Sequence, residues 1–126
     1  MMLYVADTHI LVKYLAGVLP SRFQPVFRES EKGIHIIFIP TIVLAEIIYL
    51  IKRKKISLDF EQTISKIEES KNFIIVPFNI DILKLFSNIK EYEIHDAIII
   101  ATTNYLNGIL ITQDKEIINS KEVKIY

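Results

Sequence analysis

Four carboxylates occupy positions from which they could act together on a substrate: Asp7, Glu46, Asp96 and Asp114. Asp7 and Asp114 each follow a short apolar stretch directly, while Glu46 and Asp96 lie in longer apolar segments typical of buried helices. Carboxylates without thiolates suit hard divalent cations such as Mg²⁺ and Mn²⁺ better than zinc. Such ions activate water and neutralise charge on a phosphoryl oxygen, so this set of residues predicts phosphodiester hydrolysis.

Each of these acids also has a simpler structural explanation. Asp7 and Asp114 suit the N-caps of helices, and Asp96 suits the first turn of a helix, where the helix dipole favours a negative charge. Taken singly, these explanations are the better supported ones. The hypothesis of shared chemistry therefore depends on the acids converging in space.

Glu46 is the acid that helix capping does not explain. Its segment, TIVLAEIIYLI, is apolar nearly all round, so the helix should be buried. The residues beside it on a helix, three and four positions away, are Ile42, Val43, Tyr49 and Leu50. None of them is a cation, and a buried carboxylate without a partner is costly. We therefore expect Glu46 to contact a polar partner or a metal ion.

Length and composition predict one domain spanning residues 1–126, because a chain of this size can bury one sizeable core. Fifteen Lys and Arg residues balance fifteen Asp and Glu residues, so any attraction to nucleic acid must come from a local patch. The absence of Cys excludes disulfides and thiolate metal sites. Since the N-terminus also lacks the pattern of a signal peptide, the expected location is the cytoplasm.

Residues 34–51, IHIIFIPTIVLAEIIYLI, are apolar enough to suggest a membrane span. Pro40 near the middle argues against one continuous helix, and Glu46 would cost about 2–3 kcal/mol inside a bilayer. The first half is rich in β-branched residues. A strand followed by a helix explains the segment better, and we expect no membrane association.

Strand-like and helix-like segments alternate along the chain. The predicted strands are residues 3–6, 34–39, 73–78, 109–112 and 123–126, and the predicted helices cover about residues 10–15, 20–32, 41–54, 57–70, 79–89 and 94–106. Thr41, Ser57 and Asn79 suit the starts of three of these helices, and Asn107-Gly108 suits a left-handed end of the last one. This alternation predicts an α/β fold with a parallel sheet covered on both faces. Right-handed crossovers place the carboxyl ends of all strands at one edge, where Asp7, Glu46 and Asp114 would meet. The position of Asp96 depends on the strand order, which these patterns leave open.

Four short motifs follow one another in order along nearly the whole chain. They are Asp7-Thr8-His9-x-Leu11, Thr41 to Glu46, His95-Asp96-Ala97-x-x-x-Ala101 and Thr112-x-Asp114. In order and in strand–helix alternation, this set resembles the PIN-domain ribonucleases, particularly the VapC-like toxins of type II toxin–antitoxin systems. The resemblance implies a PIN-like three-layer sandwich with a five-stranded parallel sheet in the order 3-2-1-4-5.

The resemblance also implies a site and a reaction. The implied catalytic residues and ligands of Mg²⁺ or Mn²⁺ are Asp7, Glu46, Asp96 and Asp114, with Thr8 and Thr112 in support. The implied activity is metal-dependent hydrolysis of RNA, and the implied partners are a cognate antitoxin and a second copy of the chain.

Three cations are candidate RNA contacts: Lys13, Lys52 and Arg53. The run at residues 52–55 is also typical of a helix C-terminus, where cations offset the dipole, and that explanation is the better supported one. Two other functions stay open. One is a PIN-like binding module that has lost activity. The other is a phosphatase-type domain with Asp7 as nucleophile, although such a site would want a second Asp where His9 stands.

Overall fold

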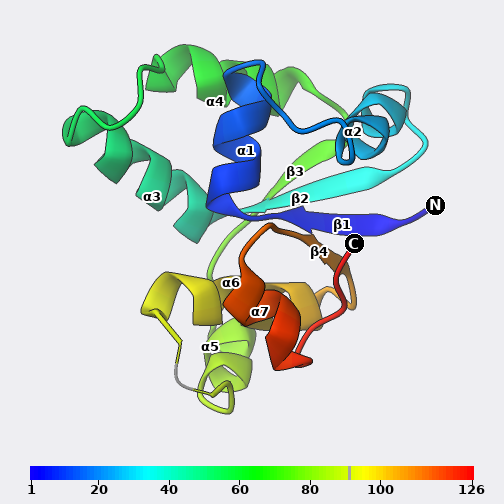
Figure 1. Ribbon diagram of the computed structural model, residues 1–126, viewed down its shortest axis with the longest axis vertical. Helices are drawn as coiled ribbons and strands as arrows, with labels where there is room; N and C mark the ends of the chain where they lie inside the picture. The colour runs from blue at the N-terminus through cyan, green and yellow to red at the C-terminus, as the bar shows by residue number, and fades with distance from the viewer. Residues whose placement is uncertain (91) are drawn as a thin grey trace.

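A parallel sheet forms the middle layer of the structure (Figure 1). The computed structural model describes residues 1–90 and 92–126, and within them four strands pair in the order β3-β2-β1-β4. The strands are β1 (Leu3–Ala6), β2 (Ile36–Pro40), β3 (Phe73–Val76) and β4 (Ile109–Ile111). The first strand is therefore central, and it pairs with β2 on one side and β4 on the other.

Helices cover both faces of this sheet, as the sequence predicts (Figure 1). One layer contains α1 (Thr8–Leu15), α2 (Gln24–Glu31), α3 (Thr41–Lys52) and α4 (Phe60–Glu69). The other contains α5 (Ile80–Phe86), α6 (Ile94–Tyr105) and α7 (Lys115–Ser120). The predicted α/β sandwich is confirmed.

The predicted fifth strand is reduced to a single bridge. Residues 121–126 run beside β4, where Leu110 N donates to Lys124 O at 2.8 Å and Tyr126 N donates to Leu110 O at 3.0 Å. Lys121, in the left-handed conformation with φ of 58°, turns the chain out of α7 just before this contact. The last segment thus occupies the predicted fifth position, beside β4, but pairs with that strand at one residue only.

Residues 34–51 form a strand and a helix rather than a span. Pro40 ends β2 in an extended conformation, and α3 begins at the next residue. Strand residues Ile37 and Ile39 and helix residues Val43 and Ile47 are fully buried in the core. Within the described part of the chain, no helix has the length and hydropathy to cross a membrane.

Two predicted helix starts are wrong in detail. Thr41 does not cap α3; its hydroxyl accepts a hydrogen bond from Phe78 N at 3.2 Å, in the segment after β3. Ser57 does not start α4, which begins at Phe60 with Asp59 as its cap. Asp59 Oδ1 accepts from Gln62 N at 2.9 Å, so the carboxylate of Asp59 caps this helix in place of the Ser57 hydroxyl.

Helices α5 and α6 pack against each other on the face of the sheet opposite α1 (Figure 1). Asn79 caps α5 as predicted, because its Oδ1 accepts from Ile82 N at 2.9 Å. The predicted end of α6 is also confirmed. Asn107 takes the left-handed conformation with φ of 52°, and Gly108 N closes the turn on Thr103 O at 2.9 Å.

We expect Asn79→Ala to lower the free energy of unfolding by about 1 kcal/mol, because it leaves an N–H group at the start of α5 without its partner. Urea denaturation followed by circular dichroism measures the change. Asn79→Asp is the matched control, since it keeps an accepting oxygen and should stay within about 0.5 kcal/mol of the wild type. Equal losses in both variants would contradict the capping role.

Candidate metal centre

All four predicted acids line one cavity of about 240 Å³. Its lining residues are Asp7, Thr8, His9, Glu46, Glu93, Asp96, Ile99 and Asp114. In the described part of the chain, no Lys or Arg contributes to this lining. We call this space the acid cavity. It brings together side chains from the ends of β1 and β4 and from α3 and α6.

Asp7 joins three elements of the fold. It follows β1 and caps α1, because its Oδ1 accepts from Ile10 N at 2.9 Å. Its Oδ2 accepts a hydrogen bond from the hydroxyl of Thr112, the residue after β4. The side chain is buried, and burial raises the pKa of the Asp7 carboxyl while these two hydrogen bonds oppose that rise. Thr112, to which the family resemblance assigns a supporting role, thus contacts Asp7 directly.

Glu46 has the polar partner that its apolar helix lacks. Thr8 at the start of α1 donates its hydroxyl to Glu46 Oε1 at 2.6 Å. His95, at the start of α6, places its Nδ1 3.9 Å from Glu46 Oε2. The partners therefore come from neighbouring elements, where helical spacing could not reveal them, and Thr8 lies in its predicted supporting position.

Asp114 is both a cap and a cavity residue. Its Oδ1 accepts from Glu116 N at 2.9 Å and from Ile117 N at 3.2 Å, and it caps α7, a helix whose cap but not whose range the sequence predicts. Its own N–H donates to the Thr112 hydroxyl at 3.0 Å. The capping explanations of Asp7 and Asp114 are thus confirmed. They do not compete with a shared site, because each carboxylate has further lone pairs.

Asp96 lies in the first turn of α6, the position that the sequence left open. The sheet order brings that turn to the carboxyl ends of the strands, near the start of α3 (Figure 1). Partial burial raises the pKa of the Asp96 carboxyl to about 6, and neighbouring negative charges add to the rise. In decreasing order of influence, those charges are Asp114, Glu93, Glu46 and Asp7.

Glu93 is an acid of the cavity lining that the sequence-based prediction missed. It caps α6 by accepting from His95 N at 3.0 Å and Asp96 N at 3.3 Å, and it also bonds the His95 ring. Burial alone would raise the pKa of Glu93, but the hydrogen bonds and the adjacent imidazole lower it overall. Ligand atoms of Glu46, Glu93 and His95 lie within 4.8 Å of one another. The sequence signal that could have revealed Glu93 is its place three residues before Asp96, from which an acid can cap the helix that contains Asp96.

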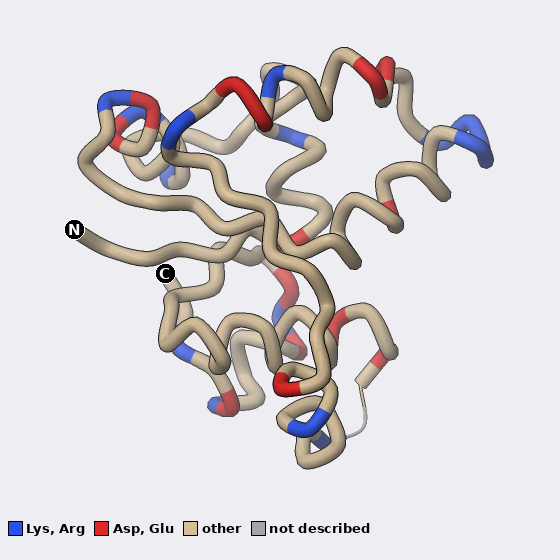
Figure 2. The backbone as a smooth tube through the Cα atoms, turned by 180° about the vertical axis from the view of Figure 1, so that it is seen from behind, with Lys and Arg blue, Asp and Glu red and all other residues tan. Residues whose placement is uncertain are grey.

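The three candidate RNA contacts lie outside the lining of the acid cavity. Lys13 Nζ donates to Gln113 Oε1 at 2.6 Å, beside Asp114. Lys52 ends α3 and Arg53 is its C-cap, so the capping explanation of this run agrees with the structure. Figure 2 shows the basic run at the far tip of α3, while acidic segments from both helical layers face the middle of the molecule.

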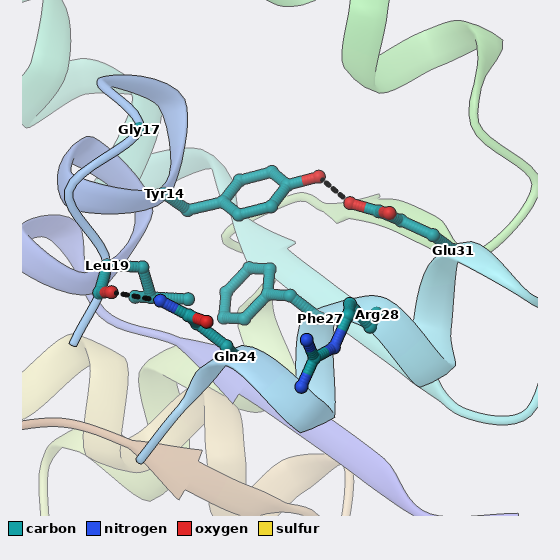
Figure 3. A pocket seen from close by; sticks show the side chains of 7 residues that line it. All are labelled: Tyr14, Gly17, Leu19, Gln24, Phe27, Arg28 and Glu31. Carbon is teal, nitrogen blue, oxygen red and sulfur yellow. Dashed lines mark hydrogen bonds between the residues drawn. The ribbon is translucent and has the colours of Figure 1, made fainter. Parts of the chain in front are cut away.

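A separate cavity of about 250 Å³ lies between α1 and α2 (Figure 3). Figure 3 shows Tyr14 reaching across it to Glu31, and its hydroxyl donates to that carboxylate. The Tyr14 ring stacks on Phe27 with centroids 4.4 Å apart. Because the lining contains Glu31 as its one carboxylate among the described residues, this cavity lacks the donors for a hard metal ion.

We expect Asp96→Asn to stabilise the metal-free protein at pH 7 by about 1 kcal/mol. The pKa of Asp96 is raised from 3.8 to about 6, so folding favours its protonated form, and the wild type loses stability as pH rises through 6. The full shift would correspond to about 3 kcal/mol, which partial solvent exposure reduces. Urea titrations in EDTA at pH 4 and pH 7 measure the difference.

The gain from Asp96→Asn should disappear at pH 4, where the wild-type carboxyl is largely protonated. Asp81→Asn is the matched control, because Asp81 is an exposed first-turn acid of α5 that is absent from the cavity lining. An equal gain at both pH values would contradict the electrostatic cause.

Comparison with known proteins identifies the family. The PIN domain family model matches residues 4–122. A chain of VapBC2 from Rickettsia felis, crystallised with a DNA fragment from the promoter, shares the fold with a TM-score of 0.76. It is 21% identical, and the match covers 99% of this chain and 98% of that one. VapBC-1 from nontypeable Haemophilus influenzae gives a TM-score of 0.69 at 22% identity, with 99% and 97% covered.

A toxin–antitoxin complex from Klebsiella pneumoniae gives a TM-score of 0.66 at 21% identity, with 100% and 96% of the two chains covered. These identities are low, so the likeness to solved structures describes the fold. No curated protein matches this chain. The family match extends over nearly the whole sequence, from the middle of β1 to the residues after α7, and includes all four acids of the cavity. The chain belongs to the PIN-domain family.

Proposed function

We propose that this protein is a metal-dependent endoribonuclease that hydrolyses RNA at the acid cavity and forms the toxin of a toxin–antitoxin pair. The observation that carries the proposal is the convergence of Asp7, Glu46, Asp96 and Asp114 on one cavity without a lining Lys or Arg among the described residues. Membership of the PIN-domain family supports it independently.

The donor set fits Mg²⁺ or Mn²⁺. Carboxylate oxygens with hydroxyls nearby match the preference of these ions, and the raised pKa of Asp96 reflects negative charge that a cation would neutralise. The residues that would hold the ion are Asp7, Glu46, Asp96 and Asp114, with Glu93 as an added neighbour. When bound, the ion lowers the pKa of water and offsets charge on the scissile phosphate.

The remaining residues orient these acids. Thr112 fixes the direction of the Asp7 carboxylate, and Thr8 fixes that of Glu46. Because Glu46 Oε1 is held by Thr8, its Oε2 faces the side of His95 and is available to position the attacking water. Glu46 is therefore the acid that we expect to matter most for placing that water. Lys13, Lys52 and Arg53 are proposed contacts to the RNA backbone.

The phosphatase alternative is weakened by the environment of Asp7. Only 6% of the residue is exposed, and both of its oxygens accept hydrogen bonds, which lower the nucleophilicity of the carboxylate. An inactive binding module remains the second candidate. The cluster of carboxylates argues against it. Repulsion between the acids contributes to the raised pKa of Asp96 and lowers the stability of the fold, and a module without metal chemistry would gain nothing in return.

Two protein partners belong to the proposal. One structural relative is a toxin–antitoxin complex, which supports a cognate antitoxin for this chain. A second copy of the chain is the other partner. Helix α5 exposes Ile80 by 62% and Leu83 by 43%, one turn apart on the same helix face, and provides apolar surface for such a contact.

Purified wild-type protein should cut a mixed single-stranded RNA pool in Mg²⁺ or Mn²⁺ and not in EDTA. Asp96→Asn should lower the rate at least about 100-fold, because the cavity loses a charged ligand. Asp81→Asn should retain wild-type activity. If the wild type fails to cut and Mn²⁺ leaves its melting temperature unchanged, the metal site itself is contradicted and the binding module becomes the better hypothesis.

Multi-angle light scattering should give the wild type twice the mass of one chain. Leu83→Glu should yield single chains with an unchanged circular dichroism spectrum, because it places a charge within an apolar contact. Lys84→Glu, an exposed neighbour on the same helix, is the control for added charge. A wild type that remains a single chain at all concentrations would contradict the homodimer.

A further inference from the structure

A second cavity, of about 660 Å³, adjoins the acid cavity. The two share three lining residues, His9, Glu46 and Glu93, so they lie side by side. The rest of its lining is Ala45, Tyr49, Leu50 and His95. We call it the side pocket. Whatever occupies it lies directly beside the proposed reaction site.

The apolar wall of the side pocket comes from one face of α3. Tyr49 and Leu50 lie three and four positions after Glu46, one helical turn further along the same face. Tyr49 is 59% exposed, although the core residues of this helix are fully buried. A large exposed aromatic ring on the wall of an open pocket offers a flat surface for stacking another ring.

Arg53 continues this face by one more turn. Its guanidinium carbon lies 5.7 Å from the centroid of the Tyr49 ring, within range for a cation–π contact. It belongs to the basic run at residues 52–55, which is exposed and lies at the tip of the molecule (Figure 2). Along about 10 Å of helix axis, therefore, α3 presents an acid, an aromatic ring and a cation in sequence.

This order suits a short stretch of a nucleic acid strand. A phosphate at the acid cavity would be neutralised by the proposed metal ion, a base would stack on Tyr49, and a further phosphate would reach Arg53. The chain as a whole has no net charge, so overall charge does not attract a nucleic acid strand. Any such attraction must come from this local set of groups on α3. A base inside a duplex is already stacked and paired, so only an unpaired base can enter the pocket.

We propose that the side pocket holds one unpaired nucleobase of single-stranded RNA, next to the scissile phosphate, with Tyr49 as the stacking platform and Arg53 as a backbone contact. The proposal rests on the proposed nuclease function and names its substrate class. Tyr49 is a positioning residue, because it contacts a flanking base and not the reacting atoms.

The test uses the wild-type cleavage site in an RNA pool with Mn²⁺. Three short RNAs spanning that site are compared: one is intact, and each of the other two has an abasic ribose on one side of the cut. Loss of the stacked base should lower wild-type kcat/KM about tenfold at one of the two positions. Tyr49→Ala should lose about the same factor on intact RNA and lose nothing more on the abasic RNA.

Two further variants control for structure. Tyr49→Phe keeps the ring and should retain wild-type kcat/KM. Tyr105→Ala removes a ring of similar exposure, 42%, that lines neither of the two cavities, and should also match the wild type. Arg53→Gln should weaken RNA binding and reduce its salt dependence, because one phosphate contact is lost.

The outcomes separate this proposal from the nuclease function. If the wild type cuts RNA but Tyr49→Ala cuts equally well and an abasic ribose has no effect, the side-pocket proposal is overturned and the nuclease stands. If the wild type does not cut, fluorescence anisotropy of a labelled single-stranded RNA decides. Weaker RNA binding by Tyr49→Ala than by Tyr105→Ala would support a base-binding side pocket. Equal binding would contradict the side pocket as well as the nuclease function. A Tyr49→Ala variant that loses a dimer and has normal kcat/KM would assign the ring to a protein interface and overturn the proposal.

Discussion

The buried carboxylate of Asp7 is the constraint on which this structure depends. Its two oxygens accept hydrogen bonds from the backbone of α1 and from the hydroxyl after β4, so one side chain joins the first strand, the first helix and the last paired strand. Burial of the charge is costly, and the raised pKa of Asp7 expresses that cost. The sheet order places β1 between β2 and β4, and thereby brings the donors to this carboxylate.

Helix capping and site formation turn out to be the same arrangement in this fold. Asp7, Glu93 and Asp114 each cap a helix, and all three acids line the acid cavity. The amino ends of the helices partly offset the repulsion between the acids, since each helix dipole is positive there. A carboxylate needs few of its lone pairs for a cap, so it can accept a ligand as well. Structural and chemical explanations of a single acid are therefore compatible in this chain.

The fold and the meeting of Asp7, Glu46 and Asp114 at one edge of the sheet were predictable from the sequence, because they depend on local patterns and on the geometry of parallel sheets. What it left open depends on contacts between distant segments. Asp96 reaches the site only through the strand order, and Glu46 finds Thr8 and His95 only across helix boundaries. Glu93 was missed because Glu is an uncommon cap. The length of the fifth strand was overestimated. Ile125 is apolar, as a strand residue should be, but it is the one residue of that segment that pairs with β4.

The place of β1 in the sheet has a consequence for synthesis on the ribosome. Asp7 emerges early, but its partner Thr112 lies 105 residues later in the chain, and Asp96 and Asp114 also come from the last third. Segments far apart in sequence must close a long loop before they meet. The acid cavity therefore forms only after the segment through Asp114 has left the exit tunnel, and a shorter nascent segment carries no assembled acid cavity.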